Sequence, residues 1–503
     1  GRPPREVAAD LLAGLPASPF VERAEVAGPG FLNLFLTDRW LHDGLRAAIA
    51  GGASYGRSPR NDRSVQVEFV SANPTGPLHL GHARNAVIGD ALASVLDAAG
   101  WRVEREYYFN DAGRQMELFG ASVECRYLEH FGRPAEFPED GYPGDYLVAV
   151  AADIAAEHGE AFLDLPAEER RARLLAAGAE RVLAMIRSSL ARLGVVFDTY
   201  LSERTLHERG EVERAIATLR ERGAAYDADG AVFFRATDYG DDKDRVLVRS
   251  NGAPTYFAAD CGYLVDKFAR GFDRLIYVWG ADHHGDVARV KGAATALGYD
   301  PDRLEMILYQ WVSLLRDGEV VGMSKRAGTF ETLDDLLDEV GADATRFLLL
   351  SRSGDSPLEF DIELAKRRSM DNPVFYVQYA HARCASVLRL AEERGLDAGP
   401  IEAADLALLA TEAETELLRT LVELPDQVRV AADLRAPHRL VHYAQALAAA
   451  FHRFYADCRV VGEEPALAAA RLWLARASRT AIGNVLGLIG VSAPEAMERL
   501  GAD

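Results

Sequence analysis

The chain has 503 residues and a formal net charge of −21 at pH 7, with 49% hydrophobic and 26% charged residues. This composition is that of a globular protein with several domains, and it excludes a chain that is mainly disordered, collagen-like or coiled coil. Charges or prolines interrupt every long apolar run, so we expect no transmembrane helix. The negative charge argues against general affinity for nucleic acid, although a local basic patch can still bind it.

The N-terminus and the cysteines indicate the compartment. The sequence GRPPREVAADLL lacks the basic and apolar regions of a signal peptide, and because it begins without Met we expect a fragment or a processed chain. The four cysteines, Cys125, Cys261, Cys384 and Cys458, are far apart and form no CxxC pair. We therefore expect no zinc site and no disulfide framework, and a reducing cytoplasm suits this chain. The Asp and His residues of WGADHHGD could ligate a metal, but no further ligands lie at suitable spacing, so we expect no other metal site.

The first part of the chain predicts a small α+β unit and then a βαβ unit. Residues 5–15 have a helical pattern, and EVAGPGFLNLFL alternates like a strand after a Pro-Gly turn. Residues 52–63 are rich in Gly, Ser and Arg and suit a linker. Val65–Val70 is an apolar run with one Glu, which is typical of a buried parallel strand. An amphipathic helix ending near Gly100 and a strand over Glu104–Asp111 follow, so residues 60–115 predict half of a parallel sheet.

The rest of the chain predicts an insertion, a second α/β segment and a helical tail. Residues 116–243 contain helical stretches such as Ala167–Leu193, separated by turns, and we expect them to interrupt the sheet. Residues 244–365 return to α/β character, with a helix around Asp260–Ala269 and a strand over Arg274–Trp279. From about Asp334 onward the pattern is helical. In the region 366–503 we expect amphipathic helices over Pro373–Arg394, Ala404–Leu424, Pro437–Asp457 and Ala466–Leu488.

A strand, a turn and the start of a helix carry the first candidate site. His79 and His82 lie three residues apart at the mouth of this helix, with Gly81 between them, so both face one side of its first turn. A helix N-terminus attracts phosphate, imidazoles can donate hydrogen bonds to it, and a glycine lets a nucleotide approach the backbone. The alternative is that two polar residues merely cap a helix.

Two further loops could bind phosphate or nucleotide. Met323, Ser324 and Lys325 stand between two glycines, and the chain has only five lysines against 56 − 5 = 51 arginines, so the choice of Lys is informative. A lysine in such a loop could close on the β- and γ-phosphates, although a solvated basic loop is the alternative. In WGADHHGD, Gly280, Asp282 and His283 follow the carboxyl end of a strand, where open α/β sheets bind ligands.

Together these segments resemble the class I aminoacyl-tRNA synthetases. HLGH stands where that class has HIGH, and GMSK stands where it has KMSK. The stretches EFVSANPTGPLHLGHARNAVIGDAL, YYFNDAG and MSKRAGTF are similar to arginyl-tRNA synthetase, and the resemblance covers essentially the whole chain. It implies an α/β fold, namely a Rossmann-type nucleotide-binding catalytic domain with an inserted connective region. It also implies an all-α anticodon-binding helix bundle over residues 366–503 and, over residues 1–50, the remnant of an α+β N-terminal add-on domain.

The resemblance also implies an arginine–tRNA ligase. ATP, accompanied by Mg²⁺, would activate L-arginine to arginyl-adenylate, and the arginyl group would pass to the 2′-hydroxyl of the terminal adenosine of tRNA(Arg). No covalent side-chain nucleophile, prosthetic group or zinc is implied, and tRNA would have to bind before activation. We expect a cytoplasmic monomer without a membrane partner.

The family's motifs assign roles to individual residues of this chain. Gly322 replaces the first Lys of KMSK, and His283 falls where some family members have Gln. The expected catalytic residues are His79, His82 and Lys325. The expected ATP-binding residues are His79, Gly81, His82, Gly280, Asp282, Met323, Ser324 and Lys325. The expected arginine-binding residues are Glu68, Ser71, Asn73, Tyr256, Asp260 and His283.

The charge of the substrate supports two of these assignments independently. A guanidinium is always charged, so its pocket needs carboxylates. Glu68 lies in an apolar strand, where a lone buried carboxylate is costly without a cationic partner. Bound arginine would supply that partner, and a local salt bridge to an Arg of the chain is the alternative; the same question applies to Asp260.

The helical tail combines arginines with aromatic residues, a combination that suits the unstacked bases of an anticodon loop. An ordinary helix bundle with solvated arginines is the alternative. The expected tRNA-binding residues are Arg435, Arg439, Arg453, Tyr455 and Arg459.

Three other functions remain open from the sequence. A synthetase for another amino acid would keep both histidines and Lys325 without needing Glu68 or Asp260. A different nucleotidyltransferase would lack a tRNA-binding tail. A catalytically silent tRNA-binding relative would have no need of His79, His82 and Lys325, which are all present.

Overall fold

The computed structural model describes residues 1–321 and 332–498, which form two compact units. The larger unit contains residues 59–366 and 435–438, and the other contains residues 1–58, 367–434 and the chain from residue 439 onward. None of the helices in the described part is long and apolar enough to cross a membrane.

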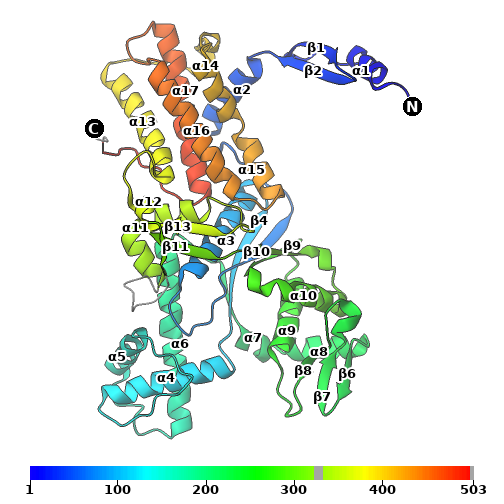
Figure 1. The fold of residues 1–503 in the computed structure, drawn as a ribbon, viewed down its shortest axis with the longest axis vertical. Coiled ribbons are helices and arrows are strands. Elements are labelled where there is room, and N and C mark those ends of the chain that lie inside the picture. The colour runs from blue at the N-terminus through cyan, green and yellow to red at the C-terminus, as the bar shows by residue number, and fades with distance from the viewer. Residues whose placement is uncertain (322–331, 499–503) are drawn as a thin grey trace. The chain divides into compact units, whose positions relative to one another are not determined.

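A parallel sheet of five strands is the centre of the larger unit (Figure 1). The strand order is β10-β9-β3-β4-β5, so the chain leaves β3 toward β4 on one side and later adds β9 on the other. The order therefore reverses between β3 and β9, which is where open α/β sheets bind ligands. This confirms the predicted Rossmann-type fold. The strands are β3 (Ser64–Glu68), β4 (Arg102–Phe109), β5 (Thr199–Ser202), β9 (Arg274–Gly280) and β10 (Leu304–Tyr309).

Close packing joins β3 to the helix that follows it, α3 (Leu80–Ala98). Every residue of β3 is buried, including the polar side chains of Ser64, Gln66 and Glu68, as expected for a central strand of a parallel sheet. A Cβ atom at Gly89 of α3 would lie 2.2 Å from Cγ of Phe69, so only glycine allows this approach. The helix ends at Ala98, Ala99 caps it, and Gly100 follows with a φ of 93°.

The segment between β4 and β9 begins with three helices that pack together: α4 (Arg114–His130), α5 (Tyr146–His158) and α6 (Ala167–Arg192). The chain then returns to the central sheet as β5, which the predicted insertion over residues 116–243 did not foresee because a four-residue strand leaves no clear period. The next elements are α7 (Glu203–Glu208), α8 (Glu211–Glu221) and an antiparallel sheet of β6 (Ala225–Ala228), β7 (Ala231–Phe234) and β8 (Arg245–Val248). Two helices flank β9: α9 (Tyr256–Ala269) and α10 (His284–Leu297).

A small second sheet completes this unit. It contains β11 (Val312–Arg316), β12 (Glu319–Val321) and β13 (Leu358–Asp361), and the helices α11 (Leu333–Leu349) and α12 (Ile362–Lys366) adjoin it. The expectation of purely helical structure after Asp334 is wrong at β13. Its alternating residues LEFD pair in parallel with β11, and this long-range partner is invisible to a local pattern.

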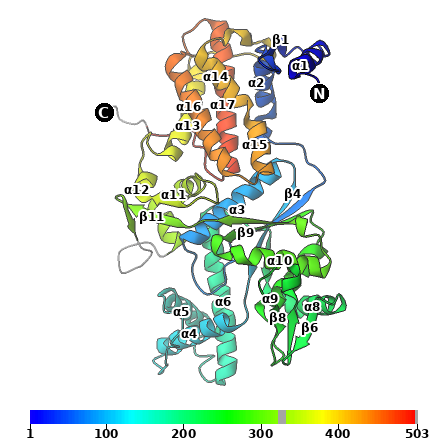
Figure 2. The same ribbon diagram turned by 45° about the vertical axis from the view of Figure 1, so that its right-hand side comes forward.

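The other unit contains a β-hairpin and a helix bundle (Figures 1 and 2). The expected helix over Ala404–Leu424 is wrong in its first part, because Thr411 caps a shorter helix by accepting a hydrogen bond from the backbone of Glu414. A further helix, α15, was not predicted. The elements are α1 (Pro4–Ala13), β1 (Val21–Ala27), β2 (Phe31–Leu36), α2 (Arg39–Gly51), α13 (Pro373–Glu393), α14 (Glu412–Val422), α15 (Leu424–Asp433), α16 (His438–Asp457) and α17 (Pro465–Leu488).

Candidate active site

A cavity of about 340 Å³ opens at the reversal point of the central sheet. The ends of β3 and β9 form its floor, and residues of α9 and α10 form its walls. Five of the residues that sequence analysis assigned to the arginine or ATP site line this one cavity: Glu68, Ser71, Asp260, Gly280 and His283.

The backbone at the end of β3 has an uncommon shape. Val70 and Ser71 have φ values of 66° and 45°, a region that β-branched residues rarely adopt. Asn85 of α3 holds this turn, since its Oδ1 accepts a hydrogen bond from the Val70 N–H at 2.6 Å. Its Nδ2 donates to the carbonyl of Val278 in β9 at 2.9 Å. One buried amide therefore fixes both strand ends that form the cavity floor.

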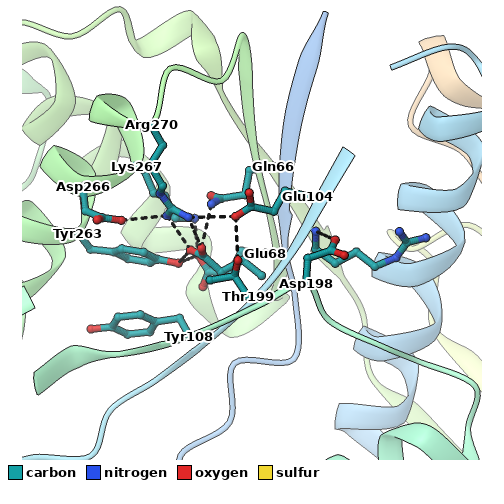
Figure 3. Close-up of polar contacts among 12 residues, drawn as sticks. Gln66, Glu68, Glu104, Tyr108, Asp198, Thr199, Tyr263, Asp266, Lys267 and Arg270 are labelled. Carbon is teal, nitrogen blue, oxygen red and sulfur yellow. Dashed lines mark hydrogen bonds and ion pairs between the residues drawn. The ribbon is translucent and has the colours of Figure 1, made fainter. Parts of the chain in front are cut away.

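Glu68 has a cationic partner within the protein. Nζ of Lys267 lies 2.5 Å from its Oε2, and the Tyr263 hydroxyl lies 2.9 Å from the same oxygen (Figure 3). Its Oε1 accepts a hydrogen bond from Oγ of Ser71 at 3.1 Å. The idea that Glu68 is a lone buried carboxylate that needs the substrate as its cation is therefore wrong. The local salt bridge exists, but Lys267 forms it in place of an Arg.

Asp260 is the carboxylate in the cavity that lacks a partner. Among the described residues no side chain forms an ion pair or hydrogen bond with its carboxylate, which is open to the cavity. Asp260 is exposed toward the cavity, but the protein atoms packed around it weaken its hydration, and the negative charges of Glu203, Asp286 and Glu68 add repulsion, so its pKa rises to about 7. Such a site favours a bound cation.

Sequence analysis missed two charged residues of the cavity wall, Asp286 and Arg289. Nδ1 of His283 lies 3.0 Å from Oδ2 of Asp286, and Nη1 of Arg289 donates to Oδ1 of Asp286 at 2.7 Å. Arg289 also donates to Asp241 at 3.1 Å. The charges of Asp286 and Arg289 are therefore satisfied within the protein, in contrast to that of Asp260.

Two of the expected arginine-binding residues do not line this cavity. Asn73 forms hydrogen bonds on both ends of its amide, donating to Gln115 at 2.8 Å and accepting from the Asn110 N–H at 3.1 Å. Tyr256 begins α9 and is 49% exposed. A Cβ atom at Gly113 would lie 2.8 Å from the Tyr256 hydroxyl, so this ring lies close to the loop after β4.

The two histidines cap α3. Nδ1 of His79 accepts a hydrogen bond from the Gly81 N–H at 3.2 Å, and Nδ1 of His82 accepts one from the His79 N–H at 3.2 Å. Their rings stack with centroids 3.8 Å apart. Desolvation lowers the pKa of both, that of His82 to about 3 with a further contribution from His79. Both imidazoles are therefore neutral at pH 7, and because Nδ1 accepts in each, the proton resides on Nε2.

The signature loop lies outside the described residues. Met323, Ser324 and Lys325 fall in the range 322–331, so their predicted roles stay predictions. The described chain resumes at Thr332, whose side chain caps α11. The Leu333 N–H donates to the carbonyl of Leu78 at 2.7 Å, so the chain after the loop starts beside the HLGH turn. Asp282 follows β9 and is exposed.

The expected tRNA-binding residues have different surroundings. Arg435 belongs to the larger unit, where its Nε and Nη2 pair with Glu305 at 2.8 and 3.0 Å. Arg453 of α16 forms ion pairs with Glu412, Glu416 and Asp457 at 3.1, 2.6 and 3.8 Å.

Near the end of α16, an exposed aromatic residue and an arginine remain as candidate contacts. Tyr455 is 44% exposed, and the guanidinium of Arg383 lies 4.6 Å from its ring centroid. Arg459 is exposed, and Arg439 of the same helix is partly buried. The arrangement of Tyr455 with Arg383 suits stacking with a base more than the paired Arg453 does.

Comparisons with known proteins agree along the whole chain. Residues 45–353 match the model of the class I tRNA synthetase (R) catalytic domain, residues 377–497 match the DALR anticodon binding domain, and residues 1–36 match the arginyl tRNA synthetase N-terminal domain. The arginine–tRNA ligase of Carboxydothermus hydrogenoformans is 50% identical over 98% of this chain and 89% of its own length.

Two solved structures are also similar. A Campylobacter jejuni protein assigned as an arginyl-tRNA synthetase superposes with a TM-score of 0.85 at 35% identity, covering 92% of this chain and 100% of its own. The Thermus thermophilus arginyl-tRNA synthetase superposes with a TM-score of 0.76 at 26% identity, covering 99% of this chain and 92% of its own.

Proposed function

The chain belongs to the class I arginyl-tRNA synthetase family, and from this premise we propose how its residues divide the work of an arginine–tRNA ligase. The enzyme uses ATP to activate L-arginine and transfers the arginyl group to tRNA. The three alternatives that the sequence left open, namely a synthetase for another amino acid, another nucleotidyltransferase and a silent relative, are set aside by this family membership.

Asp260 binds the guanidinium of the substrate. The observation that carries this assignment is the carboxylate of Asp260, which has no ion pair with any residue of the described ranges 1–321 and 332–498. In the same cavity Glu68 and Asp286 already have cationic partners. A guanidinium can form two parallel hydrogen bonds with one carboxylate, which gives both affinity and orientation. Tyr108, Tyr277 and Trp279 line the same cavity and can cover the aliphatic part of the substrate.

The HLGH turn binds the phosphates of ATP. The N–H groups at the start of α3 and the Nε2 protons of His79 and His82 offer donors to phosphate oxygens without adding positive charge in the ground state. As charge moves onto the phosphate oxygens in the transition state, these donors stabilise it. Gly81 allows the His79 ring to take its place at the start of α3, because a Cβ atom at residue 81 would lie only 3.1 Å from Cε1 of that ring.

The remaining assignments complete the proposal. Gly280 and Asp282 hold the adenosine side of ATP at the end of β9, and Met323, Ser324 and Lys325 close on its phosphates. Ser71, Asn73 and Tyr256 orient the reacting end of arginine, and Mg²⁺ arrives with ATP. Tyr455, Arg459, Arg439, Arg453 and Arg435 are proposed tRNA contacts. We further propose a cytoplasmic monomer; all four cysteines are buried free thiols, as a reducing compartment permits.

Arginine-dependent exchange of pyrophosphate into ATP, measured with tRNA present, tests the assignment of Asp260. We expect Asp260→Asn to raise the KM for arginine about tenfold or more, because a charged hydrogen bond is lost, with little change in the KM for ATP. Asp238→Asn, which changes an exposed aspartate elsewhere in the same unit, is the matched control. If Asp260→Asn raised only the KM for ATP, Asp260 would belong to the ATP site, and its assignment to arginine binding would be wrong.

A further inference from the structure

A row of polar side chains on one face of α9 connects the cavity to the buried part of the sheet. Asp260, Tyr263 and Lys267 lie at positions i, i+3 and i+7, so they share one face of the helix, and Arg270 follows at i+10. Asp260 opens into the cavity, Tyr263 is a mostly buried residue of its lining, and Lys267 is completely buried and does not line it. The same helix face therefore carries the proposed substrate ligand Asp260 and a deeper polar network. Figure 3 shows Tyr263, Lys267 and Arg270 of this network close to Glu68.

The strands opposite this face bring two carboxylates together. Glu68 of β3 and Glu106 of β4 are direct neighbours in the parallel register, and they are only 5% and 0% exposed. Like charges at neighbouring sheet positions repel, and burial increases the cost. The network therefore requires two cations at this place.

Lys267 and Arg270 supply these cations, one for each carboxylate. Arg270 binds Glu106 with both terminal nitrogens, and Nη2 lies 3.0 Å from Oε1. Lys267 binds Glu68, and the Tyr263 hydroxyl lies between the two carboxylates and contacts both. The pair Glu68–Lys267 thus has no net charge, although the Glu68 carboxylate itself still adds repulsion at Asp260.

The site of Lys267 suits an ammonium group. Its side chain is completely buried, and Nζ lies 3.7 Å from the ring centroid of Tyr277 and 4.4 Å from that of Tyr263. A compact ammonium fits between two rings and one carboxylate oxygen, whereas a planar guanidinium would need more partners. This explains why one of only five lysines occurs here in a chain with 51 arginines.

We propose that Lys267 is a positioning residue for arginine recognition: together with Tyr263 it neutralises and fixes Glu68, so that Asp260 alone of these carboxylates pairs with the charge of the guanidinium. Glu68 then orients the substrate as a fixed hydrogen-bond acceptor at the cavity floor. This inference rests on the proposed binding of arginine in the cavity. It predicts that Asp260 selects the positive charge of the substrate, whereas Glu68 sets the orientation of the substrate.

The first test is a double-mutant cycle of Glu68→Gln and Lys267→Met, read by pyrophosphate exchange with tRNA present. Lys267→Met should raise the KM for arginine about tenfold, since Glu68 loses its position, and leave the KM for ATP within about twofold. When Glu68 is already replaced by Gln, adding Lys267→Met should raise the KM for arginine little further. Equal increases in the two KM values, or fully additive effects, would overturn the proposal, because Lys267 would then serve stability alone.

The second test measures charge selectivity with citrulline, whose urea group is a neutral isostere of the guanidinium. The ratio of the citrulline inhibition constant to the arginine KM should stay within about threefold of wild type in the double variant, which removes a neutral pair. The ratio should fall at least tenfold in Asp260→Asn. A comparable fall in the double variant would show that Glu68 contributes charge, and would overturn the proposal.

Controls separate this inference from the proposed function. Lys243→Met removes an exposed lysine of the same unit. It should change neither the KM for arginine nor the ratio of the citrulline inhibition constant to that KM. If Lys267→Met does not fold, the double variant still decides, because it leaves no unpaired buried charge. Failure of Asp260→Asn to affect arginine would refute the proposed binding site, whereas a loss of selectivity in the double variant would refute only the role of Lys267.

Discussion

The raised pKa of Asp260 makes arginine binding depend on pH in a defined direction. Desolvation and the charges of Glu203, Asp286 and Glu68 raise this pKa to about 7, while Arg289 opposes the shift. Only the ionised carboxylate can pair with a guanidinium, so apparent affinity should fall as pH falls through 7. A pKa of about 7 gives an ionised fraction of about 10/11 at pH 8 and about 1/11 at pH 6.

The KM for arginine should therefore be about tenfold higher at pH 6 than at pH 8. In the HLGH turn, desolvation lowers the pKa of His79 and brings that of His82 to about 3, so His82 stays neutral throughout this range. Pyrophosphate exchange at saturating ATP and tRNA, at fixed ionic strength, measures the effect. Asp260→Asn should remove the slope, and a His283→Gln variant should retain it. A flat profile in the wild type, or an unchanged slope in Asp260→Asn, would refute the reasoning.

Three further predictions concern stability and the ATP site. Lys267→Met should destabilise the larger unit by about 3–5 kcal/mol, because it leaves Glu68 buried and unpaired, and the double change with Glu68→Gln should recover most of this in denaturant titrations. Gly89→Ala should destabilise by about 1–3 kcal/mol, since its Cβ atom would overlap Phe69; an unchanged unfolding midpoint would mean that the contact relaxes freely. His82→Ala should lower kcat by about tenfold to a hundredfold with little change in the KM for arginine, measured by tRNA-dependent exchange, and an unaltered kcat would contradict its proposed role.

The features that sequence analysis predicted correctly are local ones. The apolar run of β3, the helix after HLGH and the strand RLIYVW follow from residue type and period, and the reversal of strand order brings them together at one cavity. Glu68, Ser71, Asp260, Gly280 and His283 meet there because each follows, or faces, a strand end at the reversal point.

The features that it missed depend on long-range partners. A local reading assigned no role to Lys267, because its importance comes from the neighbouring register of Glu68 and Glu106 on two strands. One signal was available: in YFAADCGYLVDKFAR the polar residues Asp260, Tyr263 and Lys267 recur on one face of a helix that is otherwise mostly apolar. The same limit explains β13, which forms only because β11 pairs with it.

The structure of the enzyme with L-arginine bound tests the central claim most directly. We predict that the guanidinium lies within hydrogen-bond distance, about 3 Å, of both carboxylate oxygens of Asp260, while Glu68 keeps its contact with Lys267. An arginine whose guanidinium pairs with Glu68 after Lys267 has moved away, or one bound outside this cavity, would contradict the account.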